Sequence, residues 1–224
     1  DITTGMEWTT PYSTPTIQVT TFRSGVYALQ ITSLGSGTQQ GLRYSFSAAP
    51  ANGPFLFRAY FRVATTPAAE NRIIMLNDAN NLTAPIAWIA IDNAGALILR
   101  DEDGAIGSPS SALSVDTWYR IEMQIDTTAA AGSQVVRALL DGTEFAGAAN
   151  RSLSAGVMTF FVGGNYGGEA NTTGNWYFDD VAINDSTGSF QTTYPGEGEI
   201  IHLRPNAAGD NSAWTRGGAD SGAN

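Results

Sequence analysis

The sequence predicts an all-β protein in which two antiparallel sheets pack face to face. Apolar and polar residues alternate with a period of two over many short stretches, and Gly, Pro, Asn, Asp and Ser separate these stretches. No stretch shows the spacing of an amphipathic helix. Many short strands without helices between them are typical of a β-sandwich, and we expect a jelly roll.

Two strands are predicted most clearly. In residues 55–64, apolar residues alternate with a second set formed by Leu56, Arg58, Tyr60 and Arg62. In residues 118–126, apolar residues alternate with polar ones, and Glu122 belongs to the polar set. We expect one face of each strand to be core and the other to be solvated. Residues 86–92 and 96–100 flank a turn and predict a hairpin. Further strands are expected at 17–21, 26–33, 41–47, 73–77, 135–140, 157–162, 176–183 and 200–203.

Two segments fall outside this regular pattern. Residues 163–174 form a glycine-rich loop, and residues 191–224 are too polar and too rich in glycine to build a core of their own. We therefore expect a sandwich domain over residues 1–190 and a C-terminal extension over 191–224. The extension should lie across the sandwich or reach a neighbouring subunit.

Composition limits the classes of function. The 224 residues carry a formal net charge of −10, which disfavours binding to nucleic acid phosphates and to anionic membranes. The chain has no cysteine, so disulfides, iron–sulfur clusters and thiol nucleophiles are excluded. No apolar run approaches the roughly 18 residues that span a bilayer, and we expect a soluble mature chain or part of one.

Four ordered motifs carry a family resemblance. They are Asp116-Thr-Trp-Tyr-Arg-Ile-Glu122, Ala138-Leu-Leu-Asp-Gly-Thr143, Phe161-Val-Gly-Gly164 and Trp176-Tyr-Phe-Asp-Asp-Val-Ala-Ile183. Their order and spacing resemble the closing strands of the concanavalin A-like lectin and glucanase superfamily, in its laminin G-like branch. The resemblance covers residues 1–190 and implies the jelly-roll fold. It does not fix an activity, because lectins, hydrolases, lyases and structural modules share this fold.

A second resemblance lies at the C-terminal end. The runs at residues 179–188, 194–206 and 211–215 resemble the C-terminal part of jelly-roll structural proteins of tailed phages. In those relatives the chain continues further, so the resemblance implies that this chain is truncated or part of a longer product. It also implies a place on a virion or a similar extracellular assembly.

The acidic and basic residues do not form a clear catalytic set. Glu122 and Asp126 lie on one strand face roughly 13 Å apart, at about 3.3 Å per residue, which is too wide for a glycosidase pair. His202 is the only histidine and has no recognisable partner. Arg58, Tyr60 and Arg62 offer a basic aromatic stripe that would suit a polysaccharide lyase, or else an outward cover in which arginine stems pack on aromatic rings. We expect no catalytic residue.

Calcium is the metal that the resembled fold most often binds, through carboxylate and carbonyl oxygens of loops. The candidate ligands are Asp179, Asp180, Asp101 and Asp103. Alternation places either Asp179 or Asp180 inward, where a carboxylate must bind an ion or be hydrogen-bonded. Asp101 and Asp103 stand where a hairpin turn is needed, and aspartate favours turns on its own account.

Glycan binding is the ligand chemistry that the glycine-rich loop suggests. Aromatic faces stack on sugar rings while amides and carboxylates bind hydroxyl groups. The candidate glycan-binding residues are Asn165, Tyr166, Glu169, Asn171 and Trp176.

These observations favour a non-enzymatic structural or display module of a phage virion or similar extracellular assembly, which would also bind surface glycans. Its expected partners are other assembly subunits, including copies of itself, and polysaccharide. The residues expected to dock the tail onto a neighbour are Tyr194, Pro195, His202, Arg204 and Trp214. The alternative is a carbohydrate-binding module or lectin, and a polysaccharide lyase or hydrolase is the third hypothesis.

Overall fold

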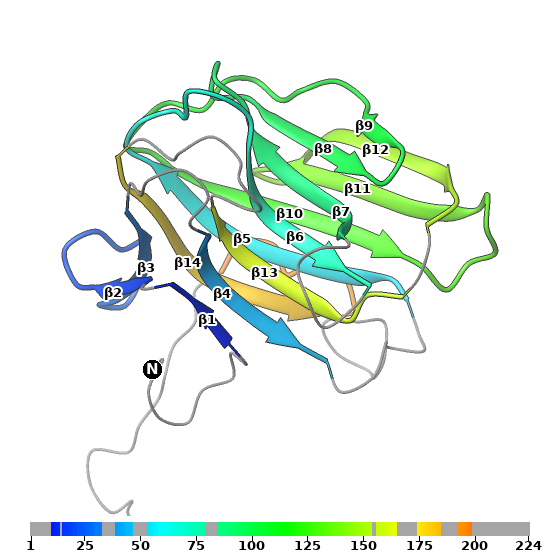
Figure 1. Ribbon diagram of the computed structural model, residues 1–224, viewed down its shortest axis with the longest axis horizontal. Helices are drawn as coiled ribbons and strands as arrows, with labels where there is room; N and C mark the ends of the chain where they lie inside the picture. The colour runs from blue at the N-terminus through cyan, green and yellow to red at the C-terminus, as the bar shows by residue number, and fades with distance from the viewer. Residues whose placement is uncertain are drawn as a thin grey trace, which may run out of the picture.

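The protein is a sandwich of two seven-stranded antiparallel sheets (Figure 1). The computed structural model describes residues 10–13, 15–32, 39–46, 53–78, 85–153, 156–164, 174–184 and 192–198. Sheet A has the order β1 (Thr10–Tyr12), β4 (Gln40–Ser45), β13 (Thr159–Gly164), β6 (Asn71–Asn77), β7 (Pro85–Ile91), β8 (Leu97–Asp101) and β9 (Gly104–Ile106). Sheet B has the order β12 (Thr143–Arg151), β11 (Gln134–Leu140), β10 (Trp118–Asp126), β5 (Phe55–Val63), β14 (Trp176–Asn184), β3 (Ala28–Ile31) and β2 (Thr16–Gln18). The predicted all-β fold is confirmed.

One hydrophobic core lies between the sheets and draws side chains from both. Alternation along β5 and β10 sends Phe57, Phe61 and Ile121 inward, and each is almost fully buried. Phe57 of sheet B stacks on Phe160 of sheet A with ring centroids 4.8 Å apart. Burial of this apolar surface is the main stabilising contribution to the sandwich.

Most strands begin and end close to the residues that the alternation predicts. The strand at 118–126 is confirmed with the same bounds, and β5 ends one residue before the predicted position. Alternation does not predict β12, because alanine and glycine make up much of residues 143–151 and obscure the period-two pattern. The expected strand at 200–203 lies outside the described residues.

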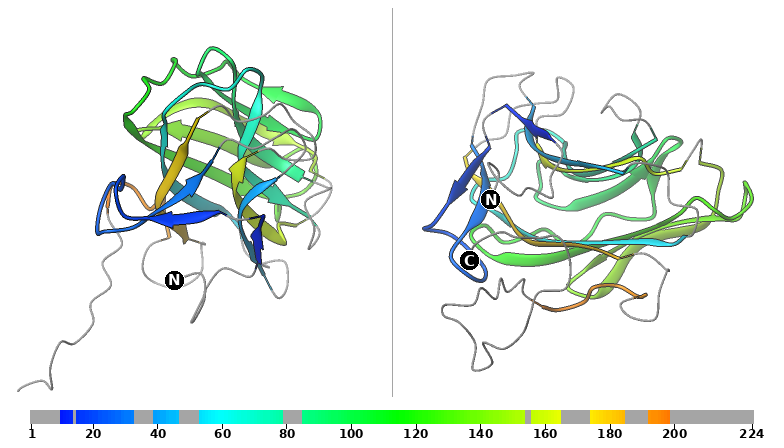
Figure 2. Two further views of the ribbon diagram at one scale, coloured as in Figure 1. Left: turned by 60° about the vertical axis from the view of Figure 1, so that its left-hand side comes forward. Right: turned by 90° about the horizontal axis from the view of Figure 1, so that it is seen from below.

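The outer face of sheet B is not the solvated surface that alternation predicts. Residues 192–198, here called the strap, cross this face, as Figure 2 shows in orange on the side away from sheet A. The Tyr194 hydroxyl donates to Gln124 Oε1 at 3.0 Å, and the Gly196 amide donates to Glu122 Oε1 at 2.8 Å. Glu122 is 1% exposed, so its expected place on a wet face is wrong.

The strap is the described part of the C-terminal extension. Its described residues lie across the sandwich, and Arg58 donates to Gly196 O at 3.0 Å. The division into units at residue 190 and the docking of the tail onto a neighbour stay predictions. Within the described ranges no helix is long and apolar enough to cross a membrane.

Candidate functional site

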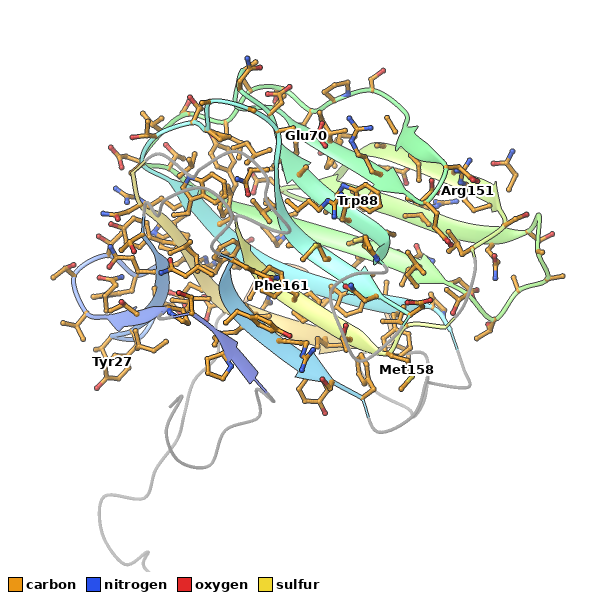
Figure 3. All side chains as sticks on the ribbon, viewed as in Figure 1. Tyr27, Glu70, Trp88, Arg151, Met158 and Phe161 are labelled. Carbon is orange, nitrogen blue, oxygen red and sulfur yellow. The ribbon has the colours of Figure 1, made fainter. Side chains whose placement is uncertain are left out.

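A row of large side chains crosses the outer face of sheet A. The strand registers place Arg43 opposite Phe161, Phe161 opposite Met75, Met75 opposite Trp88, and Trp88 opposite Arg100. We call these five residues the outer row. Met75 and Phe161, with Tyr12 and Trp88 packed on them, form an apolar cluster separate from the core between the sheets. Figure 3 shows Trp88 and Phe161 over the central part of this sheet.

Arginine side chains pack beside the aromatic rings of the outer row. The guanidinium of Arg43 lies 5.3 Å from the ring centroid of Tyr12, whose ring meets Phe161 edge-on at 6.0 Å. Arg72, which neighbours the row, lies 4.5 Å from the ring centroid of Trp88. Cation–π stacking of this kind fixes the aromatic rings and places guanidinium groups on this face.

Two glycines give Phe161 its place on the sheet. A Cβ on Gly41 would lie 2.5 Å from Phe161 Cζ, and a Cβ on Gly163 would lie 2.6 Å from the same atom. Both distances are shorter than any side-chain contact allows, so the ring occupies the space that these glycines leave open. The apolar centre of the outer row therefore depends on Gly41 and Gly163 as well as on its own residues.

A second row beside the first is polar. Thr159 lies opposite both Ser45 and Asn77, on the same face as Phe161 and Met75. Asn77 and Thr159 are 0% exposed, yet both amide atoms of Asn77 and the hydroxyl of Thr159 have no hydrogen-bond partner among the described residues. Trp88 Nε1 is likewise buried without a partner in the described ranges. Such atoms are rare in folded proteins, and here they lie beneath the surface of sheet A.

The opposite surface, on sheet B, has arginines that are internally neutralised. Arg23 pairs with Asp180 at 2.9 Å and Arg120 Nε pairs with Glu122 at 3.0 Å. Burial lowers the pKa of Arg120, but the Glu122 carboxylate and the Tyr60 hydroxyl outweigh it and raise the pKa above its ordinary value. These contacts make the arginines of sheet B part of its structural cover.

Of the two interpretations of the Arg58, Tyr60 and Arg62 stripe, the contacts favour the outward cover. Arg58 is buried and donates to Asp180 O at 3.1 Å. Arg62 lies 5.2 Å from the ring centroid of Tyr177 and pairs with Asp116 at 2.7 Å. The arginine stems pack on aromatic rings and their charged heads are engaged.

Asp179 and Asp180 hold a loop in place. Both lie at a β-bulge in β14, and Asp180 adopts a positive φ of 46°. Asp179 Oδ2 accepts from the backbone amides of Arg23 at 2.7 Å and Ser24 at 3.2 Å, and the Ser24 hydroxyl donates to Asp180. Burial raises the pKa of Asp179, and the backbone donors offset part of that rise. The carboxylates thereby fix the loop between β2 and β3 to the sheet.

The predicted calcium ligands do not fit a calcium site. Asp180 faces the Arg23 guanidinium, and Asp101 accepts two hydrogen bonds from Arg151, at 2.5 and 2.7 Å. Asp103 lies 3.2 Å from Arg151 as well. A bound cation would have to displace these arginines, and the described part of the chain holds no cluster of three or more potential metal ligands. Asp101 and Asp103 instead tie the turn between β8 and β9 to β12.

The predicted glycan site is only partly covered by the structure. Asn165, Tyr166, Glu169 and Asn171 lie outside the described residues. Trp176 is 0% exposed, and its indole nitrogen donates to Thr65 O at 3.2 Å. Its ring is part of the core and has no face for a sugar, which corrects the expectation for this residue.

Of the predicted docking residues, some are described by the structure and others are not. Tyr194 and Pro195 lie in the strap, against the chain's own sheet B, whereas His202, Arg204 and Trp214 lie outside the described residues.

Sequence reasoning missed the outer row of sheet A. Two features of the sequence could have indicated this row. Trp88 is a single aromatic residue in a strand of small and aliphatic residues, and Arg72 and Asn77 stand at the two ends of an apolar run. A bulge between Arg72 and Ile74 breaks the alternation in β6 and hides which residues share its outer face. Only the register with β13 and β7 shows that Met75 and Asn77 point away from the core.

Comparisons with known proteins show which solved structures share this fold. No family model matches the chain, and no curated protein matches its sequence. Among solved structures, the endo-β-1,4-glucuronan lyase of the fungus Trichoderma reesei is similar, with a TM-score of 0.60 and 15% identity over 82% of this chain and 92% of that one. The cellulose-induced protein Cip1 has a TM-score of 0.61 and 16% identity over 83% of this chain and 88% of that one.

A third similar structure, the sialidase of Trypanosoma rangeli, has a TM-score of 0.53 and 15% identity, and the match covers 70% of this chain but 25% of the sialidase. At these identities the similarity establishes a concanavalin A-like jelly roll.

These findings correct the functional expectation. The glucuronan lyase and Cip1 are similar to this chain over almost their whole length, which overturns both the virion module and its non-enzymatic character. The resemblance to phage structural proteins finds no support in these comparisons. The alternative expectation, a carbohydrate-binding protein, agrees better with them.

Proposed function

We propose that the protein acts on a polysaccharide that lies across the outer face of sheet A. The observation that carries the proposal is the outer row itself, in which the half-buried Trp88 packs on the buried Met75 and Phe161, between Arg43 and Arg100. Aromatic platforms flanked by hydrogen-bonding groups suit pyranose rings, whose faces are apolar and whose edges are polar. The row crosses five strands of the sheet and therefore fits a chain better than a single sugar.

The arginines favour a polysaccharide that contains uronate units. Arg43 and Arg72 bring two guanidinium groups to this face, and guanidinium binds carboxylate with two parallel hydrogen bonds. Arg100 pairs with Glu70 at 2.6 Å and is less suited to that role. The similarity to a glucuronan lyase supports the same substrate class without establishing it.

The reaction that these groups could perform is β-elimination. A base removes the proton from C5 of the uronate, the electron pair forms the C4–C5 double bond, the C4–O bond breaks, and the departing oxygen takes up a proton. Arg43 would bind the carboxylate and stabilise the charge that develops beside C5. Tyr12, which contacts Arg43, is the side chain of this surface that could take and return the proton.

The test is incubation with glucuronan, alginate and polygalacturonate, followed by the ultraviolet absorbance of the unsaturated product. Binding is measured in parallel by affinity electrophoresis. We expect Trp88→Ala to weaken binding by about tenfold and Arg43→Gln to lower the rate more than the affinity. Tyr27→Ala is the matched aromatic control, because Tyr27 is 60% exposed in the loop between β2 and β3.

The outcomes separate the possibilities. Retention of a polymer without product would assign the surface to a carbohydrate-binding module. Equal binding and turnover in the wild type, Trp88→Ala and Arg43→Gln would overturn the proposal for this face.

A further inference from the structure

A depression of about 370 Å³ lies on the opposite side of the molecule, on the outer face of sheet B. Five separate parts of the chain line it: the loop between β2 and β3, the strand β5, the strand β10, the turn after β11, and the strap. The lining residues are Arg23, Tyr60, Trp118, Arg120, Asp141 and Glu197. The proposed polysaccharide surface on sheet A contributes none of them.

Hydrogen bonds and stacking hold the lining side chains in position. The Arg23 guanidinium stacks 3.6 Å from the ring centroid of Tyr60 and donates to Gly198 O at 2.8 Å. The backbone amide of Arg120 donates to Asp141 Oδ1 at 2.8 Å. On either side of Glu197, Gly196 and Gly198 are bonded to Glu122 and Arg23. A site assembled in this way needs little ordering when a ligand binds.

The lining has two positive and two negative side chains, and the buried carboxylates behind its arginines make the whole site net negative. Arg23 and Arg120 face Asp141 and Glu197 across the depression, and each arginine has a buried carboxylate behind it, Asp180 for Arg23 and Glu122 for Arg120. Among the lining residues, no positive charge is left uncompensated for a phosphate or a uronate. What the lining offers is both donors and acceptors of hydrogen bonds beside the indole of Trp118, and this combination suits an uncharged polyhydroxyl ligand.

We propose that this depression binds a neutral saccharide, as a second site separate from the surface on sheet A. Its volume lies near the lower end of the roughly 300–1,000 Å³ of ligand pockets, which fits the end of a short oligosaccharide. The Trp118 indole stacks on a sugar face while Asp141 and Glu197 accept from its hydroxyl groups and Arg23 and Arg120 donate to its oxygens. Because Glu197 belongs to the strap, the site is complete only while the strap lies on sheet B.

The experiment is isothermal titration of the full chain with cellotetraose, maltotetraose and tetraglucuronate, with tryptophan fluorescence as a second readout. We expect at least one neutral tetrasaccharide to bind in a way that depends on Trp118, whereas tetraglucuronate, which suits the sheet A surface, should bind Trp118→Ala as it binds the wild type. Trp118→Ala should raise the Kd by about tenfold or more and remove the fluorescence change. Asp141→Asn and Glu197→Gln preserve size and should each raise the Kd several-fold, so the proposal does not depend on one truncation. Tyr27→Ala should bind as the wild type does.

Absence of binding by both neutral tetrasaccharides would overturn the proposal, as would wild-type binding of them by Trp118→Ala or a loss of tetraglucuronate binding in Trp118→Ala. The test of the sheet A surface uses acidic polymers and the Trp88 and Arg43 variants. Either site can therefore fail without the other.

Discussion

At the scale of single residues, Arg23 and Asp180 form the most consequential ion pair on sheet B. The Asp180 side chain is 2% exposed, so removal of Arg23 would leave a buried carboxylate without its charge partner. We predict that Arg23→Ala lowers the free energy of unfolding by about 2–3 kcal/mol. The double variant Arg23→Ala/Asp180→Asn should recover part of this loss, because it removes the stranded charge.

Urea unfolding monitored by circular dichroism measures both effects. Arg137→Ala is the matched control, since Arg137 and Glu144 form a pair at 3.4 Å in which both side chains are more than 40% exposed. Its cost should be below about 1 kcal/mol. Equal costs for Arg23→Ala and Arg137→Ala would show that the buried pair contributes no more than a surface one.

Tyr194 makes stability depend on pH in the alkaline range. Burial, with smaller contributions from Glu144 and Glu122, raises the pKa of Tyr194 to about 12 from an ordinary value of 10.0. The folded state therefore keeps the phenolic proton longer than the unfolded state. The stabilisation is fully present below pH 10 and is lost as the pH rises from about 10 through about 12.

The sequence contains no lysine, and its seven other tyrosines are the same in the wild type and in Tyr194→Phe, so the difference between the two pH profiles reports on Tyr194. We predict that Tyr194→Phe reduces the loss of stability between these pH values by up to about 1 kcal/mol, a figure that allows for the partial exposure of the ring. Guanidinium unfolding at a series of pH values tests this. An identical pH profile in the variant would mean that Tyr194 titrates alike in the folded and unfolded chain.

At the scale of elements, β13 and β4 approach each other through Gly163 and Gly41. A Cβ on Gly163 would overlap Gln40 O and Gly41 Cα of the neighbouring strand, so Gly163→Ala must push two paired strands apart. We predict a loss of more than about 2 kcal/mol together with weaker polysaccharide binding, because Phe161 shares that space. Thermal unfolding and affinity electrophoresis measure the two effects.

Gly132→Ala provides the comparison for that variant. Gly132 has a positive φ of 85°, and a Cβ added there would meet no atom within 4 Å, so alanine introduces backbone strain without a clash. Its cost should be about 1 kcal/mol, without any effect on polysaccharide binding. If both variants lower the free energy of unfolding by the same amount, β13 and β4 can move apart more easily than their close approach indicates.

The elements also show where a sequence is informative. Alternation in residues 55–64 and 118–126 is enough to predict β5 and β10, because a buried face imposes a period of two on any sequence. It fails for the outer faces, where Glu122 and Arg58 are buried beneath the strap. When a segment distant in sequence covers the outer face of a sheet, the polar residues on that face can be buried, and the alternation in the strands does not reveal it.

At the scale of the whole molecule, the same limit explains why sequence reasoning misses the candidate site. The outer row takes one residue from each of five strands, and its members are neighbours only through the strand order β4-β13-β6-β7-β8. The family resemblance predicts the jelly roll but not this order. The predicted glycan loop, by contrast, is a contiguous run of residues. Sequence reasoning favours contiguous sites, whereas a sandwich builds its surfaces across strands.

The single core leads to a prediction about how the molecule unfolds. The two sheets bury their inner faces against each other, and neither has a separate core on which it could remain folded. We predict one cooperative transition in which loss of sheet structure, followed by far-ultraviolet circular dichroism, coincides with exposure of tryptophan. Trp176 in the core, Trp88 on sheet A and Trp118 on sheet B report on three parts of the sandwich, and single tryptophan-to-phenylalanine variants separate their signals. Coincident midpoints indicate that the sandwich unfolds as one cooperative unit. An earlier midpoint for Trp118 than for Trp88 would show that sheet B unfolds first and that the shared core does not couple the two sheets into one transition.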